Sequence, residues 1–238
     1  MALVDAGFRA LGTTSLGVAA VHGLPDATGR TYTETVELAR RLVDLPVPVT
    51  VDIEFGLGAD PAELSGRLSM LGVAGINVED GRPDGLAPAA EQAHLIRSIK
   101  QAAPELFVNA RVDTYWGNSA VEETRHRADL YVDAGADGIF VPGLREEALI
   151  RDLVDHLPVP LNLLSELPLH QLKDLGVRRV STGSLLFRAA IKATTEAARS
   201  IRAGRPVTGV PSYAEVAART LGRRRPSERQ VDAAKNGS

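Results

Sequence analysis

Acidic side chains stand at the ends of three predicted β-strands. Asp52 and Glu54 close the first of these runs, Glu79 closes the second, and Arg111 and Asp113 close the third. Side chains two positions apart in a strand point to the same side. The carboxyl ends of parallel strands meet at one edge of a sheet, so we expect all five side chains to converge there.

Carboxylates gathered this densely are unfavourable unless a cation neutralises them. The sequence has no cysteine and five histidines, which excludes thiolate metal sites and a cysteine nucleophile and favours a hard cation bound by oxygen. We therefore predict Mg²⁺ or Mn²⁺ held by Asp52, Glu54 and Glu79, partly through water. Arg111 would bind a substrate carboxylate or stabilise negative charge in the transition state. The alternative is that these residues form salt bridges at the rim of the fold.

Three neighbouring residues each have two interpretations. Asp80 and Asp113 either support the site from behind or cap the loops after their strands. Trp116 either shapes the mouth of the site or packs in the core.

Short β-branched runs alternate with amphipathic stretches along most of the chain, which is typical of an α/β protein with a parallel sheet. The predicted strands are Arg9–Thr14, Val47–Ile53, Gly75–Glu79, Leu106–Val112, Gly138–Val141, Val159–Leu164 and Arg179–Thr182. The predicted helices are Thr33–Val43, Pro61–Leu71, Pro88–Ala102, Ala120–Ala134, Glu146–His156, Leu169–Leu175 and Ser184–Ala203.

These strands fit a (β/α)8 (TIM) barrel that lacks one unit better than a doubly wound sheet. A doubly wound sheet carries a glycine-rich phosphate loop after its first strand, and Gly12–Gly17 matches that pattern poorly. Ala2–Gly7 is typical of the end of a helix, with Gly7 as its C-cap. The sequence therefore predicts an N-terminally truncated barrel. Its first strand and most of its first helix are missing, and Met1 is then an internal start.

Composition excludes two classes of partner. The chain has 238 residues and a net charge of −3, and it lacks the basic face that nucleic acids and membrane surfaces require. It has no apolar run of the roughly 18 residues that span a bilayer, and no signal peptide, so we predict a cytoplasmic protein.

The composition changes after Ala203. The change predicts a barrel domain over residues 1–204 and a C-terminal region over residues 205–238. That region combines a short helix at Ser212–Leu221 with a polar, basic tail that contains Arg223–Arg225. A run of this kind is typical of a solvated terminus, and an arm that contacts another subunit is the alternative.

Five motifs resemble the isocitrate lyase/phosphoenolpyruvate mutase superfamily over residues 1 to about 204. They are Thr50–Gly58 (TVDIEFGLG), Ala74–Asp80 (AGINVED), Asn109–Asp113 (NARVD), Ala134–Gly143 (AGADGIFVPG) and Gly176–Gly183 (GVRRVSTG). The resemblance implies a (β/α)8 barrel that often forms dimers or tetramers with exchange of helices between subunits. It also implies Mg²⁺-dependent making or breaking of a C–C or P–C bond next to a 2-oxo acid, through an enolpyruvate-like intermediate.

The resemblance assigns roles residue by residue. The residues that match the metal-site acids are Asp52, Glu54 and Glu79. The residues that match catalytic groups are Arg111, Asp26 and Glu79, and Arg111 also matches the substrate-binding arginine. The residues that match the loop whose backbone N–H groups cradle the substrate carboxylate are Thr13, Thr14, Ser15 and Leu16. Asn162 matches a polar residue that contacts the substrate.

The chain departs from the well-known branches at two places. The lyases carry a mobile loop of Lys-Lys-Cys-Gly-His type after the fourth strand, and the mutases carry a Lys and an Asn there. Here residues 81–87 contain no Cys, Lys or His. The sixth strand ends at Phe140–Gly143 without the His of the mutases or the Glu of the lyases.

We therefore expect a Mg²⁺-dependent lyase of the short-loop, mutase-like branch, which cleaves a C–C bond in a small 2-oxo or 2-hydroxy (di)carboxylate. One alternative is P–C chemistry on phosphoenolpyruvate or phosphonopyruvate. Another is a barrel that binds a carboxylate without catalysis. A third is a phosphate-binding isomerase barrel, which rests on Ser181–Ser184 at the start of the last long helix.

Overall fold

The computed structural model describes residues 1–221. The chain divides into two compact units. One unit is Arg9–Arg188, and the other joins Met1–Phe8 to the residues from Ala189 onward. The predicted basic run Arg223–Arg225 lies outside the described residues, and the predicted domain boundary at residue 204 stays a prediction.

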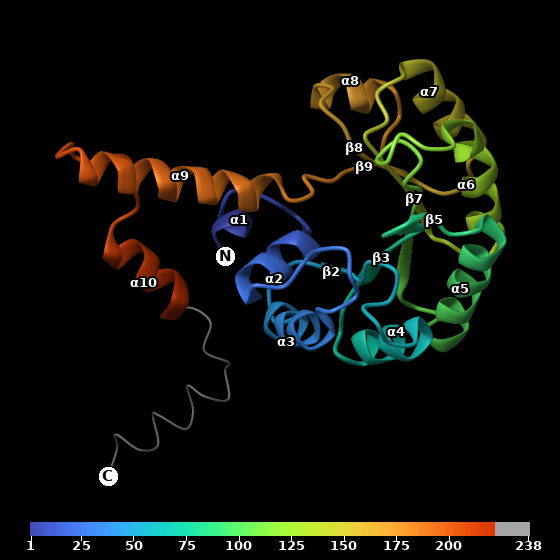
Figure 1. The fold of residues 1–238 in the computed structure, drawn as a ribbon, viewed down its shortest axis with the longest axis horizontal. Coiled ribbons are helices and arrows are strands. Elements are labelled where there is room, and N and C mark those ends of the chain that lie inside the picture. The colour runs from blue at the N-terminus through green and yellow to red at the C-terminus, as the bar shows by residue number, and fades with distance from the viewer. Residues whose placement is uncertain (222–238) are drawn as a thin grey trace, which may run out of the picture. The chain divides into compact units, whose positions relative to one another are not determined.

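The larger unit is built on one parallel sheet, as predicted. Its strands lie in the order β1-β2-β3-β6-β7-β8-β9. Their bounds are β1 Leu11–Gly12, β2 Val49–Asp52, β3 Gly75–Glu79, β6 Phe107–Arg111, β7 Gly138–Pro142, β8 Leu161–Leu164 and β9 Arg179–Val180. Figure 1 shows these strands inside an incomplete ring of helices.

The sheet is an open form of the predicted barrel, because β1 and β9 are its two ends and do not pair with each other. Its ends nevertheless curve towards one another. The Arg179 side chain at one end donates from Nη2 to Thr50 Oγ1 of β2, near the other end, at 3.1 Å. A missing first strand stays a prediction.

Helices connect the successive strands. Those of the N-terminal half are α2 Ser15–His22, α3 Tyr32–Leu42, α4 Pro61–Met70 and α5 Ala89–Ala102. Those of the C-terminal half are the 3-10 turn η1 Val121–Glu123, then α6 Thr124–Asp133, α7 Glu147–His156 and α8 Leu169–Asp174. α4 begins at Pro61 because the Asp60 carboxylate accepts the N–H of Ala62 at 2.8 Å and caps the helix.

Three local features differ from the sequence prediction. The sequence pattern assigns no element to residues 15–22, which form the short helix α2, or to residues 81–86, which pair as the hairpin β4 (Gly81–Arg82) and β5 (Gly85–Leu86). The strands predicted over 9–14 and 179–182 pair over only two residues each. A strand at the edge of a sheet has one neighbour, so fewer of its residues are fixed by hydrogen bonds than its apolar pattern predicts.

The core lies between the sheet and its helices. Val51, Ile76 and Val108 lie in adjacent strands and have no exposed surface. They belong to one apolar cluster with Leu68 of α4 and Ile96 of α5. Because side chains alternate along a strand, the strand residues on either side of Val51, Ile76 and Val108 point to the inside of the curved sheet. The candidate site residues of β2, β3 and β6 lie on this inner face.

Gly75 in β3 leaves room for the neighbouring strand. A Cβ there would lie 2.7 Å from the carbonyl oxygen of Phe107 and 2.9 Å from its Cβ. We expect Gly75→Ala to lower the free energy of unfolding in urea by about 1–3 kcal/mol, because the two strands must move apart. Gly66→Ala in α4 is the matched control. A Cβ there meets nothing closer than 4.0 Å, so it should raise stability by about 0.5–1 kcal/mol. Equal effects of the two substitutions would contradict this packing.

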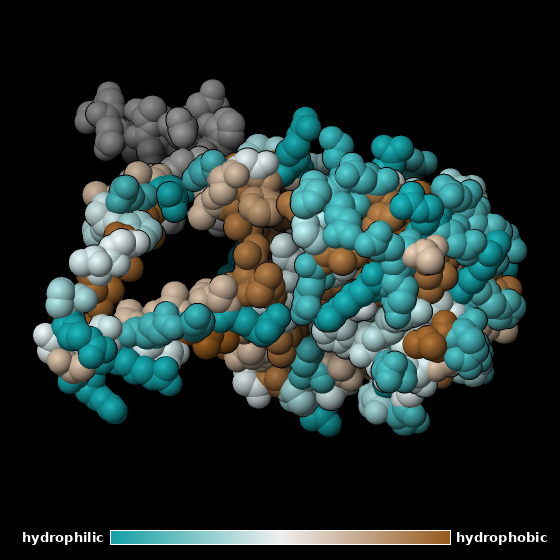
Figure 2. Space-filling model, turned by 90° about the horizontal axis from the view of Figure 1, so that it is seen from above, coloured by the Kyte–Doolittle hydropathy of each residue, from teal (hydrophilic) through white to brown (hydrophobic). Residues whose placement is uncertain are grey.

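The second unit is helical over much of its described length. It contains α1 (Ala2–Asp5), most of α9 (Leu185–Arg202) and α10 (Tyr213–Leu221). No residue of α9 is buried, and Ile191 and Ile201 are 51% and 69% exposed. Apolar residues, brown in Figure 2, reach solvent at several places on the face shown. No helix within residues 1–221 is long and apolar enough to cross a membrane.

Candidate active site

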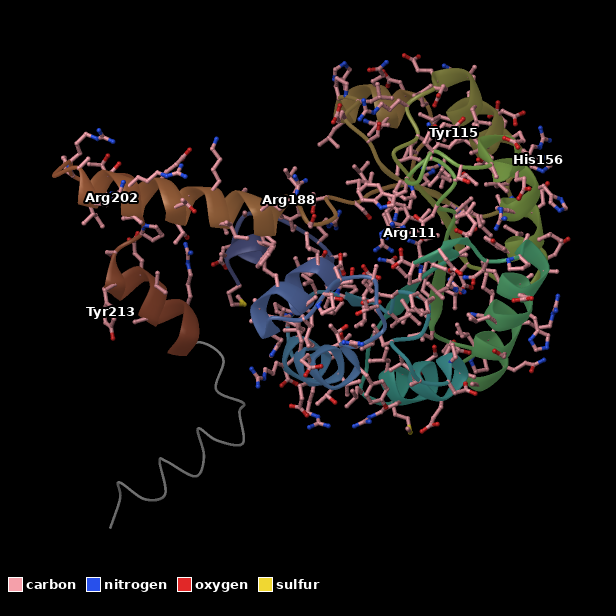
Figure 3. The ribbon with its side chains drawn as sticks, in the orientation of Figure 1. Arg111, Tyr115, His156, Arg188, Arg202 and Tyr213 are labelled. Carbon is pink, nitrogen blue, oxygen red and sulfur yellow. The ribbon has the colours of Figure 1, made fainter. Side chains whose placement is uncertain are left out.

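Arg111 lies at the centre of the candidate site, at the end of β6 and inside the curve of the sheet (Figure 3). The register of the sheet pairs it with Glu79 of β3. Its Nη1 lies 2.8 Å from Glu79 Oε2, and its Nε donates to Asp113 Oδ1 at 2.6 Å. The three side chains are between 5% and 14% exposed. Two carboxylates therefore hold two of the three guanidinium nitrogens.

Aromatic rings flank the same guanidinium. The ring centres of Trp116 and Phe140 lie 5.5 Å and 5.8 Å from the central guanidinium carbon of Arg111. Trp116 is 61% exposed, which excludes the core-packing alternative and leaves it as a surface residue beside Arg111. Aromatic rings within about 6 Å of a guanidinium attract it and so favour a single orientation.

Asp52 ends β2 and is held by the segment after β1. Its backbone N–H donates to Thr13 Oγ1 at 2.9 Å, and the N–H of Ser15 donates to its Oδ2 at 3.4 Å. Ser15 begins α2, so the positive end of that helix faces the carboxylate. The sequence predicts that the Ser15 N–H binds a substrate carboxylate, and in the structure this N–H donates to Asp52. Thr14 is the N-cap of the helix and Leu16 lies in its first turn.

Glu54 follows the strand in a left-handed backbone conformation, with φ of 49°. Its side chain is fully buried, and its Oε2 accepts the N–H of Gly29 at 2.8 Å. Its Oε1 is buried without a hydrogen-bond partner, and so is Oδ1 of Asp26. Asp26 is close enough to raise the pKa of Glu54. Two buried carboxylate oxygens with unused lone pairs make an unfavourable site unless a cation or a donor binds there.

Electrostatics link these acids. Burial raises the pKa of Asp52, Glu54 and Asp113, and raises that of Glu79 well above its usual range. The Arg111 guanidinium opposes the rise for Asp52, Glu79 and Asp113. Asp52 is the common neighbour, because its charge raises the pKa of both Glu54 and Glu79. One arginine does not balance this many carboxylates.

The donor set fits a divalent cation bound partly through water. Within residues 1–221 no three acidic or imidazole side chains converge closely enough to form a complete ligand set by themselves. The charge of Asp52 acts on both Glu54 and Glu79, and Glu54 has a buried oxygen without a hydrogen-bond partner. Carboxylate oxygens supplemented by water are the ligands that Mg²⁺ prefers. Asp52 is therefore linked electrostatically to both other predicted metal residues, and their assignment to a metal site stays a prediction.

Asn162 lies elsewhere in the sheet. It is 1% exposed, and its side-chain amide exchanges hydrogen bonds with Ser181 Oγ at 3.0 and 3.2 Å. This contact ties β8 to β9, so the amide is engaged without any substrate. Ser181, which the phosphate-binding alternative requires, is engaged in the same contact. A role for Asn162 in substrate binding stays a prediction.

The short segment after β3 is an ordered hairpin. Arg82 donates from Nη1 to the carbonyl oxygens of Glu79 and Gly81, both at 2.8 Å, and from Nη2 to Gln92 at 3.0 Å. Its guanidinium also lies 4.9 Å from the centre of the Phe55 ring. Backbone carbonyls therefore engage the one basic side chain of this segment.

Sequence reasoning missed the residues behind the site. Arg127 and Tyr131 of α6 contact the buried Asp80, whose supporting role was one of two alternatives. The available signal was an arginine and a tyrosine four residues apart, which lie on one face of a helix. A pattern of this kind is also typical of a solvent-facing helix, so it did not identify the contact.

Comparisons with known proteins identify similar chains. The family model described as phosphoenolpyruvate phosphomutase matches residues 1–202. An uncharacterized protein of Mycobacterium tuberculosis is 41% identical over 93% of this chain and 87% of that protein. The 2-methylisocitrate lyase of Bacillus subtilis is 34% identical over 79% of this chain and 69% of the lyase. The crystal structure of a 2,3-dimethylmalate lyase matches with a TM-score of 0.82 at 26% identity, covering 100% of this chain and 87% of that one.

Proposed function

Because the chain belongs to the phosphoenolpyruvate phosphomutase family, we propose that it is a Mg²⁺-dependent lyase that cleaves a C–C bond in a small 2-oxo or 2-hydroxy (di)carboxylate. Its relatives include a 2-methylisocitrate lyase, an oxaloacetate decarboxylase and a phosphoenolpyruvate phosphomutase, which are enzymes that act on small carboxylates. The finer assignment rests on the residues of the site.

The observation that carries the proposal is the arrangement of Arg111. Glu79 and Asp113 hold its Nη1 and Nε, and within the described residues its Nη2 has no hydrogen-bond partner. A guanidinium held at two of its three nitrogens presents its remaining N–H groups in a defined direction. That geometry suits a planar carboxylate, which accepts two parallel hydrogen bonds. Arg111 would bind the substrate and stabilise negative charge as an enolate develops.

Asp52, Glu54 and Glu79 would hold the cation. When bound, Mg²⁺ polarises carboxylate and carbonyl oxygens and so favours the enolate form of the product. Thr13 and Ser15 orient the Asp52 carboxylate, since both hydrogen-bond to it or to its backbone. Asp26 has an unpaired buried oxygen and could accept a proton from a substrate hydroxyl, the step that starts C–C cleavage of a 2-hydroxy acid.

The hairpin at residues 81–86 does not by itself choose between C–C and P–C chemistry. It lacks the lysine and asparagine of the superfamily's mutases and also the cysteine of its lyases, and Arg82 is engaged by backbone carbonyls. C–C cleavage is the first candidate because the match to the 2-methylisocitrate lyase covers 79% of this chain, against 58% for the match to a phosphoenolpyruvate phosphomutase. P–C chemistry remains the second candidate because the matching family model is that of a phosphomutase. A carboxylate-binding barrel without activity is the third.

A substrate panel tests the three candidates. Purified protein with Mg²⁺ would be incubated with alkyl-substituted malates, oxaloacetate, isocitrate and phosphonopyruvate, and products would be followed by NMR. We expect an EDTA-sensitive release of a 2-oxo acid or oxalate from a substituted dicarboxylate. Isocitrate should react negligibly, because the hairpin offers no thiol or amine. Turnover of phosphonopyruvate alone would support the mutase alternative, and binding without turnover would support the third candidate.

We also propose a homodimer or homotetramer. The support is the exposed apolar surface of α9, including Leu185 and Ile191, which are 52% and 51% exposed. Large apolar side chains exposed along one helix are typical of an interface. Light scattering coupled to gel filtration tests it, and a monomer at micromolar concentration would contradict it.

A further inference from the structure

A buried polar cluster lies directly behind Arg111. Its central residue is Asp80, which has no exposed surface. Asp80 Oδ2 accepts hydrogen bonds from Tyr131 OH at 2.7 Å and from Arg127 Nη1 at 3.1 Å. Both donors come from α6, on the outside of the sheet. A helix that carries no residue of the candidate site therefore contacts the residue next to Glu79.

The same cluster continues forward to the site. The other oxygen of Asp80, Oδ1, accepts the backbone N–H of Asp113 at 2.8 Å. The Asp113 carboxylate accepts the Arg111 Nε at 2.6 Å through Oδ1 and the N–H of Gly81 at 3.2 Å through Oδ2. Both carboxylate oxygens of Asp80 and both of Asp113 thus have a hydrogen-bond donor. Two carboxylates connect α6 to the guanidinium.

We propose that Tyr131 and Arg127 are positioning residues for Arg111, acting through Asp80 and Asp113. The inference rests on the proposed function, in which Arg111 binds a substrate carboxylate. A long, flexible side chain must be oriented before it can make two parallel hydrogen bonds, and packing with hydrogen bonds supplies that orientation. α6 fixes Asp80, Asp80 fixes the backbone of Asp113, and Asp113 fixes the guanidinium.

This series of hydrogen bonds is important because Glu79, the other carboxylate that contacts Arg111, is also a predicted metal ligand. Glu79 is one of the three acids that would hold the cation, so its carboxylate cannot serve Arg111 alone once a cation is bound. Asp113 is then the anchor that is not one of those three acids. Its own position depends on Asp80, and hence on the two donors of α6.

The cluster also closes the hairpin beside the site. Arg127 Nη1 donates to the carbonyl oxygen of Ala87 at 2.9 Å, and the Ala87 N–H donates to the Asp80 carbonyl at 2.8 Å. The two ends of residues 81–86 are thereby fastened to the residue that orients Asp113. Asp80 thus helps to fix the position of the hairpin as well as that of Arg111.

The substitution Tyr131→Phe tests the proposal, since it removes the 2.7 Å hydrogen bond and little volume. Tyr32→Phe is the matched control. Tyr131 accepts a hydrogen bond from Arg127 Nη1 at 3.3 Å, and Tyr32 accepts one from Arg67 Nη1 at 2.8 Å, where neither partner is a candidate site residue. Two readouts are used: the affinity for oxalate with Mg²⁺ by calorimetry, and the emission of Trp116 without any ligand. Trp116 is the only tryptophan and lies over Arg111, so its emission reports the position of the guanidinium.

We expect Tyr131→Phe to weaken oxalate binding about tenfold, as the loss of a supporting contact does in metal sites, and to shift the Trp116 emission. Tyr32→Phe should change neither. Wild-type affinity and emission in Tyr131→Phe would overturn the proposal, because a merely structural role predicts only a lower melting temperature. If wild-type protein does not bind oxalate, the proposed function fails, and the Trp116 emission alone decides this inference. If Tyr131→Phe does not fold, Arg127→Lys is tested with the same readouts and expectations.

Discussion

Replacing Arg111 with lysine is expected to lower kcat/KM for the substrate identified in the panel by about 10²–10³-fold, the cost of removing one well-placed donor to developing negative charge. Lysine keeps the positive charge, but it cannot contact both Glu79 and Asp113 and still present two parallel N–H groups to a carboxylate. Affinity for oxalate, measured by calorimetry, should fall with it. A decrease of less than about threefold would show that Arg111 does not bind the substrate.

Arg111→Met removes the positive charge, which Arg111→Lys keeps. Removing the guanidinium leaves Glu79 and Asp113 buried without their cation, which should cost about 3–5 kcal/mol of stability near neutral pH. Burial already raises the pKa of both acids. The folded state then binds more protons than the unfolded state above about pH 4, so stability falls as the pH rises. In EDTA we therefore expect the melting temperature of Arg111→Met to fall more steeply from pH 4 upward than that of the wild type. Arg40→Met, at an exposed ion pair with Glu37, should have almost no effect.

The second large effect is expected from the cation. At a concentration of Mg²⁺ and oxalate near 100 times the dissociation constant, binding should stabilise the protein by about 2.7 kcal/mol, which corresponds to roughly 5–10 °C in melting temperature. Mg²⁺ alone should have a smaller effect. The increase should decline as the pH is lowered, because protons compete with the cation for carboxylates whose pKa is raised.

Three variants assign this effect to residues. Asp52→Asn and Glu79→Gln keep the size of the side chain and remove its charge, and each should abolish most of the increase while the protein remains folded. Glu37→Gln, at an exposed ion pair on α3, is the control and should leave the increase unchanged. An unaltered response to Mg²⁺ and oxalate in both site variants would remove these acids from the metal site.

Much of the fold follows from local signals in the sequence. Runs such as residues 75–79 and 107–111 are apolar at alternate positions, and glycines or prolines bound the helices between them. These patterns are short-range, so the sequence identifies seven strands and most helices within a residue or two. Short segments carry weaker signals, because the eight residues of α2 or the hairpin at residues 81–86 depend on the sheet beside them.

The placement of acids at the carboxyl ends of strands was also determined by the sequence. Once Asp52, Glu79 and Arg111 end adjacent parallel strands, the geometry of the sheet must bring them to one edge. Their type and order sufficed to predict a carboxylate-rich site with one arginine. No knowledge of rotamers or register was needed for that step.

Only the tertiary structure decided which partner each side chain takes. The register of β3 against β6 pairs Glu79 with Arg111, and α6 brings Tyr131 to Asp80 across 51 positions of the chain. Asn162 could equally have faced a substrate, but the register of β8 against β9 places it near Ser181, and its amide bonds to that hydroxyl. Such contacts depend on the distance and orientation of groups far apart in sequence, and neither residue type nor periodicity specifies these quantities.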